Sequence, residues 1–237
     1  MELADQISGW IKEQIEGAGA RGAVVGLSGG LDSSVMAVLC KRVTDVLGLI
    51  MPLHSDPLDE EYASLLAKGF DIPVRRVDLS PVYDALARVL PDPAGLPAAN
   101  LKPRLRMATL YYFANKENRL VVGTGNKREI MMGYFTKYGD GGVDILPLGG
   151  LLKRQVRELA RELGVPSQII ARPPSAGLWA GQTDEGELGI TYDQLDRILT
   201  ALESGGTVDF DPQLVERVKR HIEETKHKRV PIPVFES

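Results

Sequence analysis

The 237-residue sequence is poor in cysteine and aromatic residues and has no large excess of charge of either sign. Its single cysteine, Cys40, excludes an intrachain disulfide and any zinc or iron–sulfur site that needs several cysteines. The 28 basic and 32 acidic residues give a formal net charge of -4, which argues against a nucleic-acid partner held by bulk charge. The scarcity of cysteine fits a protein of a reducing compartment.

Long hydrophobic runs are also missing. No apolar stretch approaches the roughly 20 residues that span a bilayer, and residues 1–5 are acidic where a signal peptide would be basic. We therefore expect a cytoplasmic protein with no membrane partner. The hydrophobic share of 43% and the charged share of 25% are typical of a globular protein, so residues 1–237 are expected to form a single domain.

Short apolar runs alternate with helical patterns along most of the chain. The runs predict buried strands at 23–27, 46–53, 74–77 and 120–122. Helical periodicity predicts helices at 3–15, 33–43, 60–69, 107–115, 151–163, 192–202 and 214–225, while 91–103 and 172–189 are expected to be irregular. Because parallel strands need crossover connections, this order predicts an α/β fold. We expect a three-layer, Rossmann-like arrangement, with an open, mostly parallel, twisted sheet and helices on both faces.

The strongest local signal is the run Ser28-Gly29-Gly30-Leu31-Asp32-Ser33, between a predicted strand and a predicted helix. Glycines let the backbone approach an anion, the helix N-terminus supplies free N–H groups, and the serines add hydroxyls. No lysine stands beside the final serine, so a Walker A loop is disfavoured. Asp32 would repel phosphate unless a cation lay between them, which suggests a Mg²⁺ ligand. The alternative is a Gly-Gly turn whose Asp and Ser only cap a helix.

This loop resembles the one with which N-type ATP pyrophosphatases grip the pyrophosphate of ATP. Within that superfamily the chain resembles the ammonia-dependent NAD synthetases, and the likeness runs from residue 26 to residue 229. The segments that carry it are 123–129 (GTGNKRE), 133–142 (GYFTKYGDGG), 173–179 (PPSAGLW), 181–185 (GQTDE) and 187–189 (ELG). The resemblance implies the N-type ATP pyrophosphatase fold and an enzyme that adenylates a carboxyl group and displaces AMP with ammonia.

Roles for individual residues follow from the same resemblance. It implies ATP contacts at Gly26, Leu27, Ser28, Gly29, Gly30, Leu31, Asp32, Ser33, Thr124, Lys153 and Ser175. It makes Asp32 and Lys153 catalytic, and Asp32 and Glu129 ligands of Mg²⁺. It implies deamido-NAD contacts at Arg104, Lys137, Asp144, His227 and Lys228, with Arg104 preferred to Arg106 by its spacing to Thr124. The partners implied are deamido-NAD, ATP as co-substrate, ammonia and a second copy of the chain in a homodimer.

Physical reasoning agrees with these roles but leaves alternatives. Moving AMP onto a carboxylate gathers negative charge that Mg²⁺ and Lys153 could neutralise. Lys153 could instead be a solvated lysine, Glu129 a carboxylate that only favours a helix start, and 227–229 a basic helix end. Alternative functions are another adenylating amidotransferase, similar to GMP synthetase, or a non-enzymatic nucleotide sensor. Cys40 falls in an apolar helix as a buried, inert thiol, so free ammonia rather than glutamine is the expected nitrogen donor.

Overall fold

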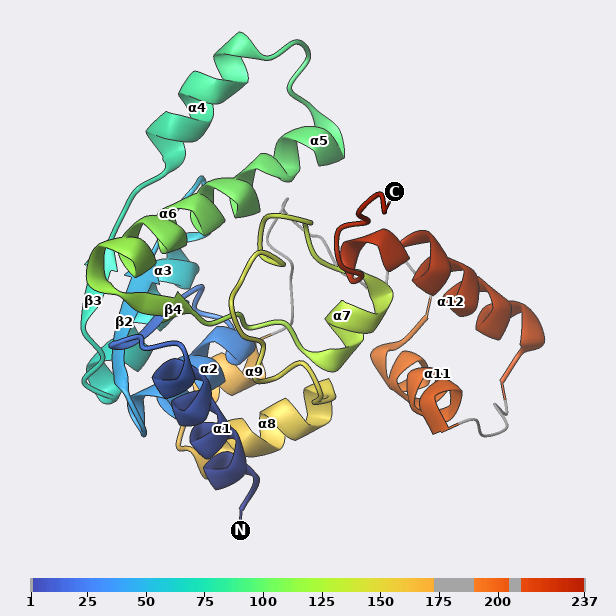
Figure 1. The fold of residues 1–237 in the computed structure, drawn as a ribbon, viewed down its shortest axis with the longest axis horizontal. Coiled ribbons are helices and arrows are strands. Elements are labelled where there is room, and N and C mark those ends of the chain that lie inside the picture. The colour runs from blue at the N-terminus through green and yellow to red at the C-terminus, as the bar shows by residue number, and fades with distance from the viewer. Residues whose placement is uncertain (1, 173–189, 205–209, 237) are drawn as a thin grey trace.

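A computed structural model describes residues 2–172, 190–204 and 210–236 (Figure 1). Its sheet has four parallel strands in the order β3-β2-β1-β4. The strands are β1 (Gly22–Gly26), β2 (Asp45–Ile50), β3 (Val74–Arg76) and β4 (Arg119–Val121). All of them start within a few residues of the predicted positions, and the three-layer α/β prediction is confirmed.

Helices cover both faces of the sheet, and a further group lies to one side (Figure 1). One face packs against α1 (Leu3–Gly17), α2 (Leu31–Lys41), α3 (Pro57–Gly69), α8 (Lys153–Glu162) and α9 (Ser167–Ala171). The other packs against α4 (Ser80–Val89) and α6 (Leu101–Glu117), which α5 (Gly95–Ala99) precedes. The side group comprises α7 (Lys127–Met132), α11 (Tyr192–Ser204) and α12 (Pro212–Glu224), followed by η1 (Lys226–Lys228). Within the described ranges, no helix is long and apolar enough to cross a membrane.

Alternation along β1 explains the layers. Successive side chains of a strand point to opposite faces, and Val25 joins the apolar cluster under α2 while Val24 joins the cluster under α6. Both are fully buried. A central parallel strand covered on both faces therefore appears in the sequence as a continuous apolar run.

The segment 91–103 differs from its prediction. It was expected to be irregular, but it contains α5, and α6 begins at Leu101, well before the predicted start at 107. Pro103 lies in the first turn of α6, where a missing N–H breaks no helical hydrogen bond. Helix α4 was not predicted either, and it contains no buried residue.

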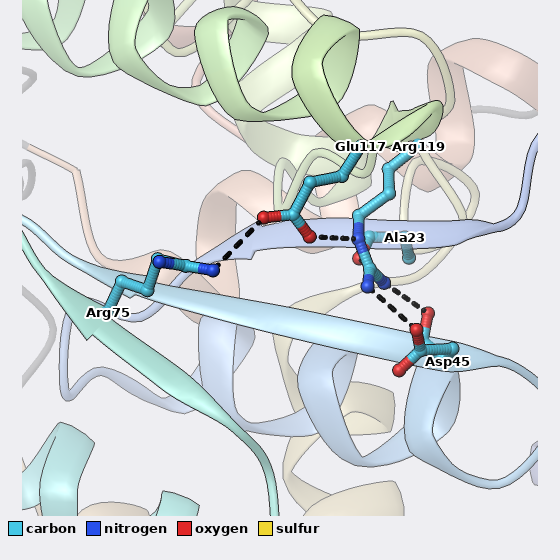
Figure 2. Close-up of polar contacts among 5 residues, drawn as sticks. All are labelled: Ala23, Asp45, Arg75, Glu117 and Arg119. Atoms are coloured by element: carbon cyan, nitrogen blue, oxygen red, sulfur yellow. Dashed lines mark hydrogen bonds and ion pairs between the residues drawn. The ribbon is translucent and has the colours of Figure 1, made fainter.

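An ion-pair network joins the strands at the end of the sheet opposite the loop of residues 28–33, which we call the phosphate loop (Figure 2). Arg119, at the start of β4, donates to Asp45 O at 3.1 Å, to Asp45 Oδ2 at 2.7 Å and to Glu117 Oε2 at 3.0 Å. Glu117 Oε1 also accepts from Arg75 at 3.4 Å. The side chain of Arg119 is only 11% exposed. This arginine thus ties the amino ends of β2 and β4 together.

Replacing Arg119 with methionine should lower the free energy of unfolding by about 2 kcal/mol, because Glu117 Oε2 and the Asp45 carbonyl lose the hydrogen bonds from Arg119. Urea titration of the parent and of Arg119→Met measures the difference. Arg161→Met, at an exposed arginine near the end of α8, is the matched control and should change stability by less than about 0.5 kcal/mol. Equal midpoints for all three proteins would contradict the expectation.

Candidate active site

The loop between β1 and α2 gathers hydroxyl and N–H groups at the start of a helix. The Ser28 and Ser33 hydroxyl oxygens lie 3.0 Å apart, and the Ser28 N–H donates to Ser33 Oγ at 3.3 Å. The Gly30 N–H donates to Ser28 Oγ at 3.3 Å, and the Ser33 hydroxyl donates to Gly30 O at 3.0 Å. This arrangement suits phosphate oxygens, which can accept from the same groups.

Backbone packing explains why this loop needs glycine. Gly29 has a φ of +72°, and a Cβ there would lie 2.3 Å from Asp59 O at the start of α3. Any other residue would therefore be strained and would clash with backbone. Leu27 and Leu31 are buried in the core, so only their backbone groups could contact ATP.

A buried ion pair links α2 to α8 beside this loop. Lys153 Nζ donates to Asp32 Oδ2. The lysine side chain is 9% exposed and the aspartate side chain 17%. The alternative of a solvated Lys153 is therefore wrong. The other oxygen, Asp32 Oδ1, is buried and has no hydrogen-bond partner within the described part of the chain.

Glu129 lies near the start of α7 and acts on the same pair. It forms a capping box with Asn126: the Asn126 N–H donates to Glu129 Oε2 at 3.1 Å, and the Glu129 N–H donates to Asn126 Oδ1 at 3.2 Å. The alternative role of Glu129, a carboxylate that favours the start of a helix, is thus seen in the structure. Removal from water and the charge of Asp32 raise the pKa of Glu129, and the charge of Lys153 lowers it. Two carboxylates therefore share a site that one lysine neutralises in part.

These groups fit Mg²⁺. A hard cation prefers oxygen ligands, and the site offers the unpartnered Asp32 Oδ1 and the nearby charge of Glu129. Among residues 2–172, 190–204 and 210–236, no three or more His, Cys, Asp or Glu side chains are grouped so that they could hold a metal ion together. Mg²⁺ commonly takes one or two carboxylates and completes its shell with water and substrate phosphates. Asp32 and Glu129 meet that description.

Two other predicted ATP residues can be placed only in part. Thr124 follows β4, which is hydrogen-bonded to β1, so it lies at the same edge of the sheet as the phosphate loop. Ser175 lies outside the described residues. The ATP roles of both stay predictions.

The 133–142 loop and the segment 225–229 hold each other through reciprocal hydrogen bonds. Lys137 Nζ donates to His227 O at 2.7 Å, and Lys228 Nζ donates to Gly133 O at 2.7 Å and to Phe135 O at 2.9 Å. At Gly133 a Cβ would lie 2.4 Å from Cβ of Thr225. The predicted substrate residues Lys137, His227 and Lys228 are therefore brought together by backbone carbonyls.

Of the other predicted substrate residues, Arg104 joins this group and Asp144 does not. Arg104 is exposed on α6, and its guanidinium donates to Lys137 O at 3.5 Å. Both carboxylate oxygens of Asp144 are used within the protein: Oδ1 accepts from the Tyr111 hydroxyl at 2.9 Å, and Oδ2 accepts from the Val121 N–H at 2.7 Å. Its bonds to β4 and α6 anchor the chain after the 133–142 loop.

Arg106, to which Arg104 was preferred by its spacing to Thr124, hydrogen-bonds to the segment after β2 and not to the 133–142 loop. Its Nε donates to Met51 O at 3.2 Å and its Nη2 donates to Ser55 Oγ at 3.1 Å. These partners follow β2 at the carboxyl edge of the sheet. The sequence does contain a signal for this placement of Arg106. The arginine lies four residues before Leu110, and so on the same face of α6, the face that packs on the sheet.

Comparison with known proteins gives one consistent result. The family model described as NAD synthase matches residues 3–232. An NH(3)-dependent NAD(+) synthetase from Finegoldia magna is 46% identical over 96% of this chain and 93% of its own length. The solved structure of an NMN synthetase from Francisella tularensis has a TM-score of 0.88 and 36% identity, covering 98% of this chain and 96% of that one. An NH3-dependent NAD synthetase from Campylobacter jejuni has a TM-score of 0.85 and 28% identity, with complete coverage of both chains.

Proposed function

This chain belongs to the NAD synthase family, and on that premise we propose how its own residues carry out ammonia-dependent NAD synthesis. The enzyme is a ligase that forms a carbon–nitrogen bond, and ATP is its co-substrate. A family match over residues 3–232 leaves no support for the GMP-synthetase-like and sensor alternatives. The observation that carries the proposal is the convergence of Asp32, Lys153 and Glu129 beside the phosphate loop.

The reaction has two steps. A carboxylate oxygen of the nicotinate ring attacks the α-phosphorus of ATP, and pyrophosphate leaves. Ammonia then attacks the carbonyl carbon of the adenylate, and AMP leaves with the oxygen that joined it to the substrate. The first step brings the negative charges of the substrate carboxylate and of ATP close together. The rate therefore depends mainly on positioning and on neutralising this charge.

Each residue near the phosphate loop has a distinct task in this proposal. The loop from Ser28 to Ser33 holds the phosphates by N–H and hydroxyl groups, and Lys153 supplies a positive charge to them. Asp32 and Glu129 would hold Mg²⁺, which when bound would supply further positive charge near the phosphates. Lys153 is ready for this task because its pairing with Asp32 already holds it at the start of α2.

The dinucleotide site lies at the 133–142 loop. Arg104, Lys137, His227 and Lys228 gather there, and the positive charges of the arginine and the two lysines suit the phosphates of deamido-NAD. Lys228 also holds the loop through two carbonyls. Asp144 supports the loop from its bonds to Tyr111 and Val121.

The direct test supplies the purified chain with deamido-NAD, ATP, Mg²⁺ and an ammonium salt, and measures NAD, AMP and pyrophosphate. We expect the three products in equal amounts. Because one of the structural neighbours is described as an NMN synthetase, nicotinate mononucleotide is supplied in a parallel reaction. A higher kcat/KM for the mononucleotide would contradict deamido-NAD as the substrate.

Glutamine should not replace ammonia. Releasing the amide of glutamine needs an activated nucleophile, and burial raises the pKa of the Cys40 thiol to about 12. Cys40 is fully buried, so Cys40→Ala should keep the parent rate with ammonia and lose about 1 kcal/mol of stability at most. The measurement is NAD formation from ammonia-free glutamine. Robust synthesis that disappears in Cys40→Ala would contradict it.

Exposed apolar side chains on α4, α5 and α6 support a homodimer. Helix α4 has no buried residue, and Val82 and Val89 on it are 50% and 77% exposed, while Leu96 on α5 and Tyr112 on α6 are 56% and 58% exposed. Association of two copies would cover this surface. Light scattering should give twice the 25.8 kDa of the chain, and Val89→Glu should give the monomer. A monomeric parent protein would contradict the proposal.

The cellular location and the domain organisation also remain proposals. A cytoplasmic location suits an enzyme that consumes ATP. A single domain over residues 1–237 suits a family match that runs over residues 3–232.

A further inference from the structure

Arg106 carries a positive charge into the region between the phosphate loop and the 133–142 loop. It lies on α6, and Leu110, one turn later, faces Gly26 at the end of β1: a Cβ at Gly26 would lie 3.8 Å from Leu110 Cδ1. The same Cβ would lie 3.4 Å from Met51 Cε. Since Arg106 donates to Met51 O, its guanidinium lies at the carboxyl edge of the sheet, next to the end of β1.

Two acidic residues, one beside the phosphate loop and one in the 133–142 loop, also lie near Arg106. The charges of Asp59 and Asp140 both act on it. Asp59 is the residue whose carbonyl packs against Gly29 of the phosphate loop, and Asp140 belongs to the 133–142 loop. Neither carboxylate forms an ion pair with Arg106 among the described residues, and Asp59 instead pairs with Arg172 at 2.7 Å.

Arg106 is therefore a half-buried cation that forms no ion pair with a carboxylate among the described residues. Burial lowers its pKa, and the charges of Asp59 and Asp140 raise it only in part. Its Nε and Nη2 atoms donate to Met51 O and Ser55 Oγ, while Nη1 has no hydrogen bond to any residue of the described ranges. A guanidinium in this state gains from an anion that accepts from its unused N–H groups.

We propose that Arg106 binds a phosphate group of a nucleotide substrate, as a second phosphate-binding cation on the side of the site opposite Lys153. Its bonds to Met51 and Ser55 hold the guanidinium fixed, so little side-chain freedom is lost when phosphate binds. The phosphate can belong to ATP or to deamido-NAD, because Arg106 stands between the two loops that serve them. The inference rests on the proposed function, since that function supplies both substrates.

The test measures KM for ATP and KM for deamido-NAD separately, together with kcat, in Arg106→Gln. The amide of glutamine can still donate to Met51 O, so the variant removes the charge more than the packing. We expect one KM to rise about 10- to 100-fold. The substrate whose KM rises is the one whose phosphate Arg106 binds. The exposed Arg161→Gln is the matched control and should leave both KM values unchanged. Unchanged KM values in Arg106→Gln would overturn the proposal.

Two further variants separate binding from positioning. Ser55→Ala removes one hydrogen bond of Arg106 and keeps its charge, so the same KM should rise by less than in Arg106→Gln. An equal rise in both variants would overturn the proposal, because Arg106 would then act only through the loop after β2. If Arg106→Gln does not fold, Arg106→Lys keeps a cation and should raise the same KM about three- to tenfold. Unchanged KM values in that variant would overturn it as well.

The parent protein separates the two levels of inference. If the parent makes no NAD from deamido-NAD, ATP and ammonia, the proposed function fails whatever Arg106 does. If the parent is active and the Arg106 variants keep its KM values, only the role of Arg106 fails.

Discussion

Asp32→Asn should slow pyrophosphate release by about 100- to 1,000-fold, because the substitution removes the charge of one of the two carboxylates that we propose as Mg²⁺ ligands. Folding should change much less. Asparagine leaves Lys153 without its closest carboxylate, but it also relieves the repulsion that raises the pKa of Glu129. The measurements are pyrophosphate release at saturating ATP and a thermal unfolding curve.

Asp71→Asn is the matched control for this substitution. Asp71 is exposed and has a φ of 50°, a conformation that asparagine also adopts. It should keep the parent rate. If Asp32→Asn folds and releases pyrophosphate as fast as Asp71→Asn does, Asp32 has no role in holding the metal.

Lys153→Met should slow the same step about 100-fold and should also destabilise the protein. It removes the cation that faces Asp32 and leaves Asp32 and Glu129 to repel each other, so we expect a loss of about 1–3 kcal/mol in the free energy of unfolding. Lys12→Met, at a half-exposed lysine of α1, is the control and should change neither quantity appreciably.

A double variant distinguishes repulsion from lost packing. If repulsion between carboxylates destabilises Lys153→Met, then adding Asp32→Asn should restore part of the lost stability. Additive losses would show instead that the buried stem of Lys153 provides the stability. Full turnover in Lys153→Met at low ATP would contradict the catalytic role of Lys153.

The sequence predicted the parts of the molecule that depend on local pattern. Continuous apolar runs marked the buried strands, and a Gly-Gly pair after the first run marked the turn between β1 and α2. Predicted strand boundaries were off by three residues at most, as for β2, which ends at Ile50 rather than at 53. The apolar run continues beyond the sheet there because Met51 and Leu53 are buried under α6.

Contacts between distant segments could not be predicted from local pattern. Helix α4 was not predicted; none of its residues is fully buried, although Tyr83 packs against the apolar cluster under α6. The capping box of Asn126 and Glu129 is a local signal, yet its position beside Asp32 depends on the whole fold. Arg106 and Arg104 differ by two positions on one helix, and only the packing of α6 shows that one faces Met51 and the other Lys137.

The hold of residues 225–229 on the 133–142 loop imposes an order on synthesis by the ribosome. Domains generally begin to fold from the N-terminal side during translation, and the residues of β1, the phosphate loop and β4 are all made long before Lys228. A nascent chain can therefore form the sheet and the phosphate loop before Lys228 is made and can donate to the carbonyls of Gly133 and Phe135. Products of premature termination before this segment would fold in part and yet be inert as ligases.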